Sequence, residues 1–302
     1  MDLEYFLGLF FSGVTRGSIY ALIALGYTMV YGIIELINFA HGEIYMIGMF
    51  TGLLVASALG MYGFPALGVL VVAGLAAVVW CAAYGYTIER IAYRPLRGAS
   101  RLSPLISAIG MSIFLQNYVM LAQTADFVSF PQLMPEFEFL EPVADMIGSS
   151  DLLIMATSLC AMVGLTLFIR CTRMGKAMRA TAQNRKMAML LGIDADRIIS
   201  LTFIIGSSLA AVGGVLIASH VVQINFSIGF IAGIKAFTAA VLGGIGSIPG
   251  AMVGGLVLGV CESYATGYIS SSYEDALTFA LLVLILLFRP AGILGKPKVQ
   301  KV

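Results

Sequence analysis

Long apolar stretches recur along almost the whole chain, and they restrict its fold more than any other feature. Of the 302 residues, 60% are hydrophobic and 11% are charged, whereas a soluble domain carries about 25% charged residues. A soluble fold would have to expose much of this apolar sequence and would aggregate. Because a membrane-spanning helix needs roughly 20 mostly apolar residues, these stretches predict a polytopic transmembrane protein.

The stretches predict an all-α transmembrane helical bundle of about eight to ten spans, which forms one domain over residues 1–302. Polar or glycine-rich turns interrupt two pairs of stretches, 9–34 with 40–60 and 228–246 with 248–266. Each turn is either a loop in water or a break in a half-inserted helix, so some spans are expected to be broken or re-entrant. The helices are expected at residues 9–34, 40–60, 64–88, 102–123, 152–170, 199–221, 228–246, 248–266 and 275–289.

Charged residues are distributed unevenly among the loops. Most of the 17 Lys and Arg residues lie in segments 90–101, 170–197 and 289–301, whereas segment 124–151 is acidic and holds no Lys or Arg. Lys and Arg accumulate in the cytoplasmic loops of membrane proteins. We therefore expect 124–151 to be an outer acidic loop, and 170–197 and the C-terminus to be cytoplasmic. Nucleic-acid binding is disfavoured, because the basic segments adjoin the membrane and no aromatic platform accompanies them.

A polar cluster interrupts the first pair of apolar stretches at Glu35, Asn38, His41 and Glu43. Charged groups are expensive inside a bilayer, so these side chains must face protein, a water-filled cavity or the cytoplasmic surface. The cluster either emerges at the inner membrane surface or lines a transport pathway. If it lines a pathway, its histidine and carboxylates also suggest a proton relay. If the segment is helical, Asn38 and His41 share one face.

A second polar set, Ser112, Gln116 and Asn117, lies inside the apolar stretch 102–123. Ser112 and Gln116 are four residues apart and are expected to face the same way. Their hydrogen-bonding groups would either bind a zwitterionic substrate or hold two helices together. Both interpretations stay open from the sequence.

Segment 170–197 contains the features of a short amphipathic helix. Met187, Leu190 and Leu191 follow helical spacing, Gly192 suits the helix C-terminus, and Asp194 suits the N-cap of the next helix. An exposed helix with one apolar face needs a partner. The membrane surface and a groove in another protein are the two candidates.

Several motifs are absent, and this restricts the function. No glycine-rich phosphate loop occurs, so the chain alone is not expected to hydrolyse ATP. No cofactor, metal or nucleophile motif occurs either, and catalysis is not expected. The spacing of Gly250, Gly254, Gly255 and Gly259 indicates close helix packing, or alternatively a helix that bends during gating.

The chain resembles branched-chain amino acid ABC permeases over almost its whole length, and the LivH-type subunit above all. The resemblance is carried by GSIYALIALGYTMVYG (17–32), INFAHGE (37–43), SAIGMSI (107–113), KAFTAAVLGGIGSIPGA (235–251) and RPAGILG (289–295). It implies a non-catalytic permease subunit in the bacterial inner membrane that imports leucine, isoleucine and valine. It also implies a second permease subunit, two cytoplasmic ABC ATPase subunits and an extracytoplasmic amino-acid-binding protein as partners.

The resemblance makes 170–197 the element that couples ATPase motion to the pore. Other ABC importers carry Glu-Ala-Ala, three residues and then Gly in this loop. Here Ala188 and Gly192 match, whereas Lys186 and Met187 occupy the first two places. The residues expected to contact the ATPase are Gln183, Asn184, Arg185, Met187, Ala188, Leu190, Leu191 and Gly192.

Two other functions remain open on the sequence alone. An ion-coupled secondary amino-acid transporter would bind its substrate within one chain and use intramembrane charges such as Glu35, His41 and Glu43. A facilitator channel is the third candidate. Transport of leucine by this chain alone, driven by an ion gradient, would favour the secondary transporter.

Overall fold

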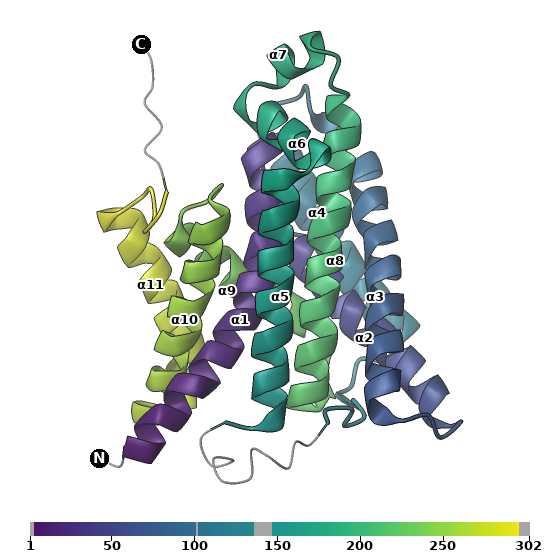
Figure 1. Ribbon diagram of the computed structural model, residues 1–302, viewed down its shortest axis with the longest axis vertical. Coiled ribbons are helices and arrows are strands. Elements are labelled where there is room, and N and C mark those ends of the chain that lie inside the picture. Colours follow the sequence, from purple (N-terminus) through teal and green to yellow (C-terminus); the bar gives the residue numbers. More distant parts are fainter. Residues whose placement is uncertain (1–2, 101, 136–146, 296–302) are drawn as a thin grey trace.

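The computed structural model describes residues 3–100, 102–135 and 147–295, which form a bundle of long helices (Figure 1). The first part of the chain contains α1 (Leu3–Ile34), α2 (His41–Gly60), α3 (Ala66–Ile88), the π-helical η1 (Glu89–Tyr93), the 3-10 helix η2 (Arg94–Leu96), α4 (Leu102–Ala122) and β1 (Val128–Ser129). The second part contains α5 (Ser149–Cys171), α6 (Arg173–Gln183), α7 (Arg185–Leu190), α8 (Ala195–Val221), β2 (Gln223–Ile224), α9 (Ile228–Gly243), α10 (Ile248–Tyr268), the 3-10 helix η4 (Ser271–Tyr273) and α11 (Glu274–Phe288).

The predicted polytopic helical bundle is confirmed. Among the described residues, 8 helices are long and apolar enough to cross a membrane, and α9 is a shorter apolar helix. Each of the nine predicted stretches contains one of these helices. The largest differences from the predicted ends are at the starts of α1, at Leu3, and of α8, at Ala195, and α9 ends early, at Gly243. Gly244 and Gly246 adopt positive φ angles of 106° and 90°, which glycine tolerates and a continuing right-handed helix does not.

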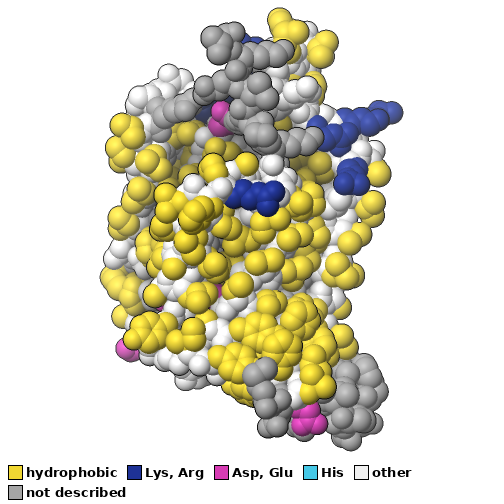
Figure 2. Space-filling model, turned by 90° about the vertical axis from the view of Figure 1, so that its left-hand side faces the viewer, with side chains coloured by type: hydrophobic (Ala, Val, Ile, Leu, Met, Phe, Trp, Pro, Cys, Tyr) yellow, Lys and Arg dark blue, Asp and Glu magenta, His cyan; other side chains and the backbone are white. Residues whose placement is uncertain are grey.

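The two ends of the bundle carry different parts of the chain. The N-terminal end of α1 lies at the lower end in Figure 1, whereas α7 lies at the upper end and α11 runs upward to its C-terminal end. The flank in Figure 2 is covered mostly by hydrophobic side chains, and the Lys and Arg side chains visible there lie in its upper half. Part of the predicted outer acidic loop, residues 136–146, lies outside the described residues.

Helices α2 and α9 both begin inside the bundle. The His41 ring lies beside Gly206, near the middle of α8, and Gly42 lies against Gly229 and Gly233 of α9. With 16 residues, α9 is about 24 Å long at 1.5 Å per residue, which is shorter than a hydrocarbon core of about 30 Å. The expectation that this segment is broken or re-entrant stays a prediction, and the short length of α9 is in keeping with it.

Helices α1 and α10 pack backbone against backbone at the predicted glycine pattern. A Cβ atom on Gly255 would lie 2.6 Å from Cα of Ala21, and one on Gly259 would collide with the backbone of Gly17. A Cβ on Gly13 would lie 2.7 Å from Cα of Val260. The close packing that the glycine spacing predicted is confirmed, because any side chain at these positions would force the helices apart.

Replacing Gly259 with leucine should therefore destabilise the bundle. We expect the free energy of unfolding to fall by about 1–3 kcal/mol or more, the usual cost of overpacking, and the melting temperature in detergent to fall with it. Gly110→Leu is the matched control, since no atom lies within 4 Å of a Cβ built at Gly110. Equal melting temperatures for the two variants would contradict the close approach of α1 and α10.

Candidate functional site

The loop between α1 and α2 places two of the predicted polar side chains inside the bundle. Helix α1 ends at Ile34, because Glu35 adopts a left-handed conformation with φ 55°, which a helix does not continue through. The chain then turns, and α2 begins at His41. The condition under which Asn38 and His41 would share a helix face is therefore not met, since Asn38 precedes the helix. Both residues are nevertheless buried, with 2% and 1% of their surface exposed.

The buried polar cluster receives hydrogen bonds from other helices. The Tyr93 hydroxyl of η1 donates to Oδ1 of Asn38 at 2.9 Å. The Ser112 hydroxyl of α4 donates to Oε1 of Glu43 at 3.0 Å. Nδ2 of Asn38, Nε2 of His41 and Oε2 of Glu43 have no hydrogen-bond partner among the described residues. Buried polar atoms of this kind are normally satisfied by water or a ligand, so the cluster can hold water or a polar solute.

The other two residues of the second polar set do not join this cluster. Ser112 is buried with 4% exposure, whereas Gln116 is only partly buried and Asn117 is exposed. The Asn117 amide donates to the carbonyl oxygen of Ile113 on its own helix at 2.8 Å. Helix α4 thus presents Ser112 to the bundle interior and Asn117 to its outer surface.

An ion-pair cluster around Lys235 lies where no site was expected. The ammonium of Lys235, on α9, is 2.5 Å from Oε1 of Glu274, 2.9 Å from Asp275 and 3.4 Å from Glu262. Arg16 of α1 reaches the same Glu274 at 3.3 Å. The sequence did contain a signal, because Lys235 and Glu262 are charged residues within apolar stretches, and such residues are usually functional or paired.

Glu262 is the most deeply buried member of this Lys235 cluster, with 0% exposure. Its carboxylate accepts a hydrogen bond from the Tyr20 hydroxyl at 2.8 Å and another from Thr278. Both carboxylate oxygens therefore have donors in addition to the Lys235 ammonium. The cluster connects α1, α9, α10 and α11 through charges that would be costly to bury alone.

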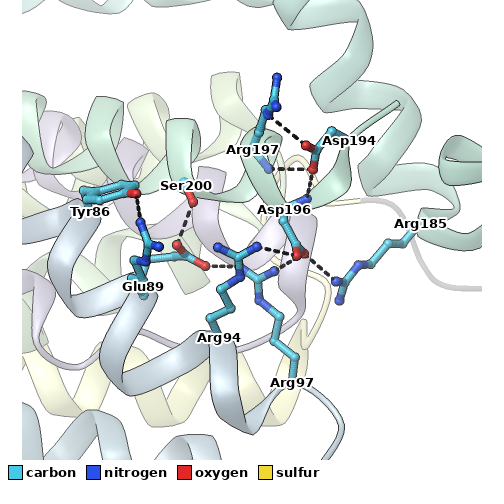
Figure 3. A network of polar contacts seen from close by, with 10 residues as sticks. Tyr86, Glu89, Arg94, Arg97, Arg185, Asp194, Asp196, Arg197 and Ser200 are labelled. Carbon is cyan, nitrogen blue, oxygen red and sulfur yellow. Dashed lines mark hydrogen bonds and ion pairs between the residues drawn. The ribbon is translucent and has the colours of Figure 1, made fainter. Parts of the chain in front are cut away.

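A second ion-pair network joins the loop between α3 and α4 to the start of α8 (Figure 3). Asp196 binds three guanidinium groups, those of Arg94 at 2.8 Å, Arg97 at 2.5 Å and Arg185 at 3.0 Å. Arg97 also pairs with Glu89, which is completely buried. Burial lowers the pKa of the Arg97 guanidinium, and the two carboxylates beside it oppose that shift. The network ties α7, through Arg185, to two spanning helices.

Helices α6 and α7 form the sizeable element at this end of the bundle. Asn184 caps α7 by accepting a hydrogen bond from the Met187 amide at 3.0 Å, and Gly192 follows with φ 83°. The predicted short helix and its glycine are confirmed. Leu190 and Leu191 are 80% and 78% exposed. The end of α7 and the residue that follows it thus carry two exposed leucines side by side in the sequence.

The capping residue expected for the next helix is also confirmed. Oδ1 of Asp194 accepts hydrogen bonds from the amides of Asp196 and Arg197, both at 3.1 Å. Ala188 of α7 is buried with 3% exposure, so α7 packs against the rest of the protein through the face that carries Ala188. Gln183 is the last residue of α6.

The sequence profile of the family described as branched-chain amino acid transport system / permease component matches residues 9–286. This chain belongs to that permease family. It is 55% identical over 302 residues to the high-affinity branched-chain amino acid transport system permease protein LivH of Salmonella typhimurium, covering 99% of this chain and 98% of the relative. It is 53% identical over 305 residues to BraD, the corresponding permease protein of Pseudomonas aeruginosa, covering 100% and 99%.

The permease also resembles a solved structure. An inward-facing ABC transporter, described as of metal-chelate type, matches with a TM-score of 0.50 and 18% identity, covering 95% of this chain and 87% of that one. At this identity the likeness concerns the fold alone. The chain is thus a multi-pass membrane protein and a permease component of branched-chain amino acid transport.

Proposed function

We propose that this permease forms the translocation pathway of an ATP-driven importer for leucine, isoleucine and valine in a bacterial inner membrane. A second permease subunit, two cytoplasmic ATPase subunits and an extracytoplasmic binding protein complete the transporter. The observation that carries this proposal is the exposed leucine pair of α7, Leu190 and Leu191, at the end of the bundle opposite the N-terminal end of α1. In this topology, that end and the C-terminus face the cytoplasm.

The contacts of α6 and α7 support a coupling role for segment 170–197. Arg179 of α6 donates to the carbonyl oxygen of Ile169 at the end of α5. Arg185 of α7 binds Asp196 at the start of α8 at 3.0 Å. ATP binding would draw the ATPases together and move α7, and these contacts would pass the motion to α5 and α8. The interface between the two permeases would then open outward.

Asn38, His41, Glu43 and Ser112 are proposed to line the pathway. Their support is burial together with three polar atoms in the bundle interior that have no hydrogen-bond partner within the described part of the chain. Gln116 and Asn117 stay predictions, because Asn117 faces the outer surface of this chain, where a second permease or lipid would lie.

The test is reconstitution of the permease pair with its ATPases in liposomes loaded with ATP. Radiolabelled leucine and the binding protein are added outside, and uptake is measured. We expect uptake that requires hydrolysable ATP and that an ion gradient cannot replace. Leucine uptake by this chain alone, driven by an ion gradient, would instead assign it to ion-coupled secondary transporters.

Replacing Leu190 and Leu191 with aspartate should abolish ATPase docking, because both leucines would be buried in the proposed contact. We expect the ATPase subunits to be lost from a pull-down through a tag on the permease. Lys176→Asp is the control, since Lys176 is exposed on α6, outside the leucine pair. Normal recovery of the ATPase by the double aspartate variant would remove the coupling assignment.

A further inference from the structure

A cavity of about 460 Å³ lies beside the Lys235 cluster. Its walls come from α1, α2, the segment around β1 and β2, the end of α8, the first half of α9, and α11. A volume of this size is within the range of small-molecule sites, about 300–1,000 Å³. Arg16 lies in the first half of α1 and Val221 ends α8, so the cavity is in the half of the bundle that holds the N-terminus.

One wall of the cavity is apolar. Ile217 and Val221 from α8, and Ile228, Ile231 and Ala232 from α9, line it. Ile231 is 46% exposed and Ala232 is 8% exposed, so the wall includes both an accessible and a buried apolar position. This surface fits a branched aliphatic side chain, which gains free energy when it leaves water.

The facing wall is charged. Arg16, Lys235 and Glu274 all line the cavity. Lys235 keeps further partners in Glu262 and Asp275, whereas Arg16 has only Glu274 as an ion-pair partner among the described residues, at 3.3 Å. Of the ion pairs at the cavity, the Arg16–Glu274 pair is thus the one that a charged ligand can replace while the fewest other ion pairs change.

We propose that this cavity is a transient binding site for the zwitterion of a branched-chain amino acid. The carboxylate of the ligand pairs with Arg16, its ammonium group pairs with Glu274, and its aliphatic side chain lies against the wall of α8 and α9. The ligand inserts between two groups that are already paired, so the total charge of the site does not change. This inference rests on the proposed function, because it names the place where the imported substrate first meets the permease.

The exchange of ion pairs also explains why such a site would be weak. Each new ion pair is offset by the loss of the internal Arg16–Glu274 pair, and partly exposed pairs contribute little individually. Weak binding suits a pathway, because conduction requires that the ligand leaves as readily as it enters. The site should reject amino acids with a basic side chain, since the apolar residues of α8 and α9 offer that charge no partner and burying it is costly. The ionisable side chain that α8 adds to the lining is the imidazole of His220, which cannot pair with a second cation.

Saturation-transfer NMR, which detects weakly bound ligands, tests the site on the assembled importer without its binding protein. Leucine should show contacts that are strongest at its methyl groups, and Ile231→Trp should reduce them at least tenfold by filling the cavity. Ile113→Trp is the matched control, because Ile113 is 55% exposed on α4 and does not line the cavity. Glu274→Gln, which leaves Lys235 its other carboxylates, should reduce contacts of leucine but not those of 4-methylpentanoate, which lacks the ammonium group.

Leucine uptake by the same preparations separates this inference from the proposed function. Uptake by the unmodified importer together with leucine contacts that Ile231→Trp and Ile113→Trp leave equal would overturn the site and leave the importer standing. Absence of ATP-driven uptake by the unmodified importer would overturn the function and the site with it. Loss of contacts and of uptake in Ile231→Trp alone, with ATPase subunits still bound, is the supporting result.

Discussion

Replacement of Lys235 with methionine is expected to be among the most destabilising single changes in this permease. The ammonium of Lys235 faces Glu262, Glu274 and Asp275, and Glu262 has no exposed surface. Removing one partner of a buried ion pair usually costs about 3–5 kcal/mol, because the remaining charge is left buried and uncompensated. Thermal unfolding of the purified protein in detergent measures the loss.

Arg16→Met provides the comparison within the same cluster. Arg16 also pairs with Glu274, but its side chain is 37% exposed, and pairs of exposed groups contribute about 0–1 kcal/mol. Adding Glu262→Gln to Lys235→Met should recover part of the lost stability, because the double variant no longer buries an isolated carboxylate. If Lys235→Met were as stable as Arg16→Met, Glu262 would have to be solvated or protonated in the native protein.

Replacement of Arg97 with methionine should cost a similar amount at the other end of the bundle. Arg97 is 8% exposed and pairs with Glu89, which is completely buried. Without the guanidinium, Glu89 keeps the hydrogen bond that the Ser200 hydroxyl donates at 2.6 Å, which does not neutralise its charge. We expect a loss of about 3–5 kcal/mol, measured as a lower melting temperature, and a loosened contact between the α3–α4 loop and α8.

Arg94→Met separates burial from the mere loss of a cation. Arg94 binds the same Asp196, at 2.8 Å, but its side chain is 42% exposed. We expect this variant to lose less than about 1 kcal/mol. Comparable losses of stability in Arg94→Met and Arg97→Met would mean that the buried charge of Glu89 does not cause the loss in Arg97→Met. If the charge of Glu89 does cause it, adding Glu89→Gln to Arg97→Met should restore stability.

The sequence predicts the spanning helices well, because a membrane requires each one to be about 20 apolar residues long. The predicted end of the first helix at residue 34 is confirmed. The end of α9 was placed at 246 instead of Gly243, because it depends on the backbone conformation at Gly244, which composition does not determine. The short helix α7 was also predictable, because Gly192 follows its C-terminal end closely and Asp194 caps the next helix, α8.

The candidate site was only partly predictable. Asn38, His41 and Glu43 stand out because they are close in sequence and polar. The Lys235 cluster is different, because Lys235 is 39 residues from Glu274, and Arg16 is 258 residues from it. Charges in apolar stretches show that partners must exist, but their identity follows from how the helices pack. The convergence of three arginines on Asp196 depends on tertiary packing in the same way.

The meeting of α2 and α9 inside the bundle makes the barrier between its two ends thin. Tyr45 and Ile228 line the cavity beside the Lys235 cluster. Glu43 and Gly229, which are one or two residues away along the chain, lie against each other in the polar interior. At this contact the backbone of Gly42 lies against Gly229 and Gly233, and Glu43 and Met46 also pack against Gly229. A change in how the first turns of these two helices pack would therefore act on the cavity and on the polar interior together.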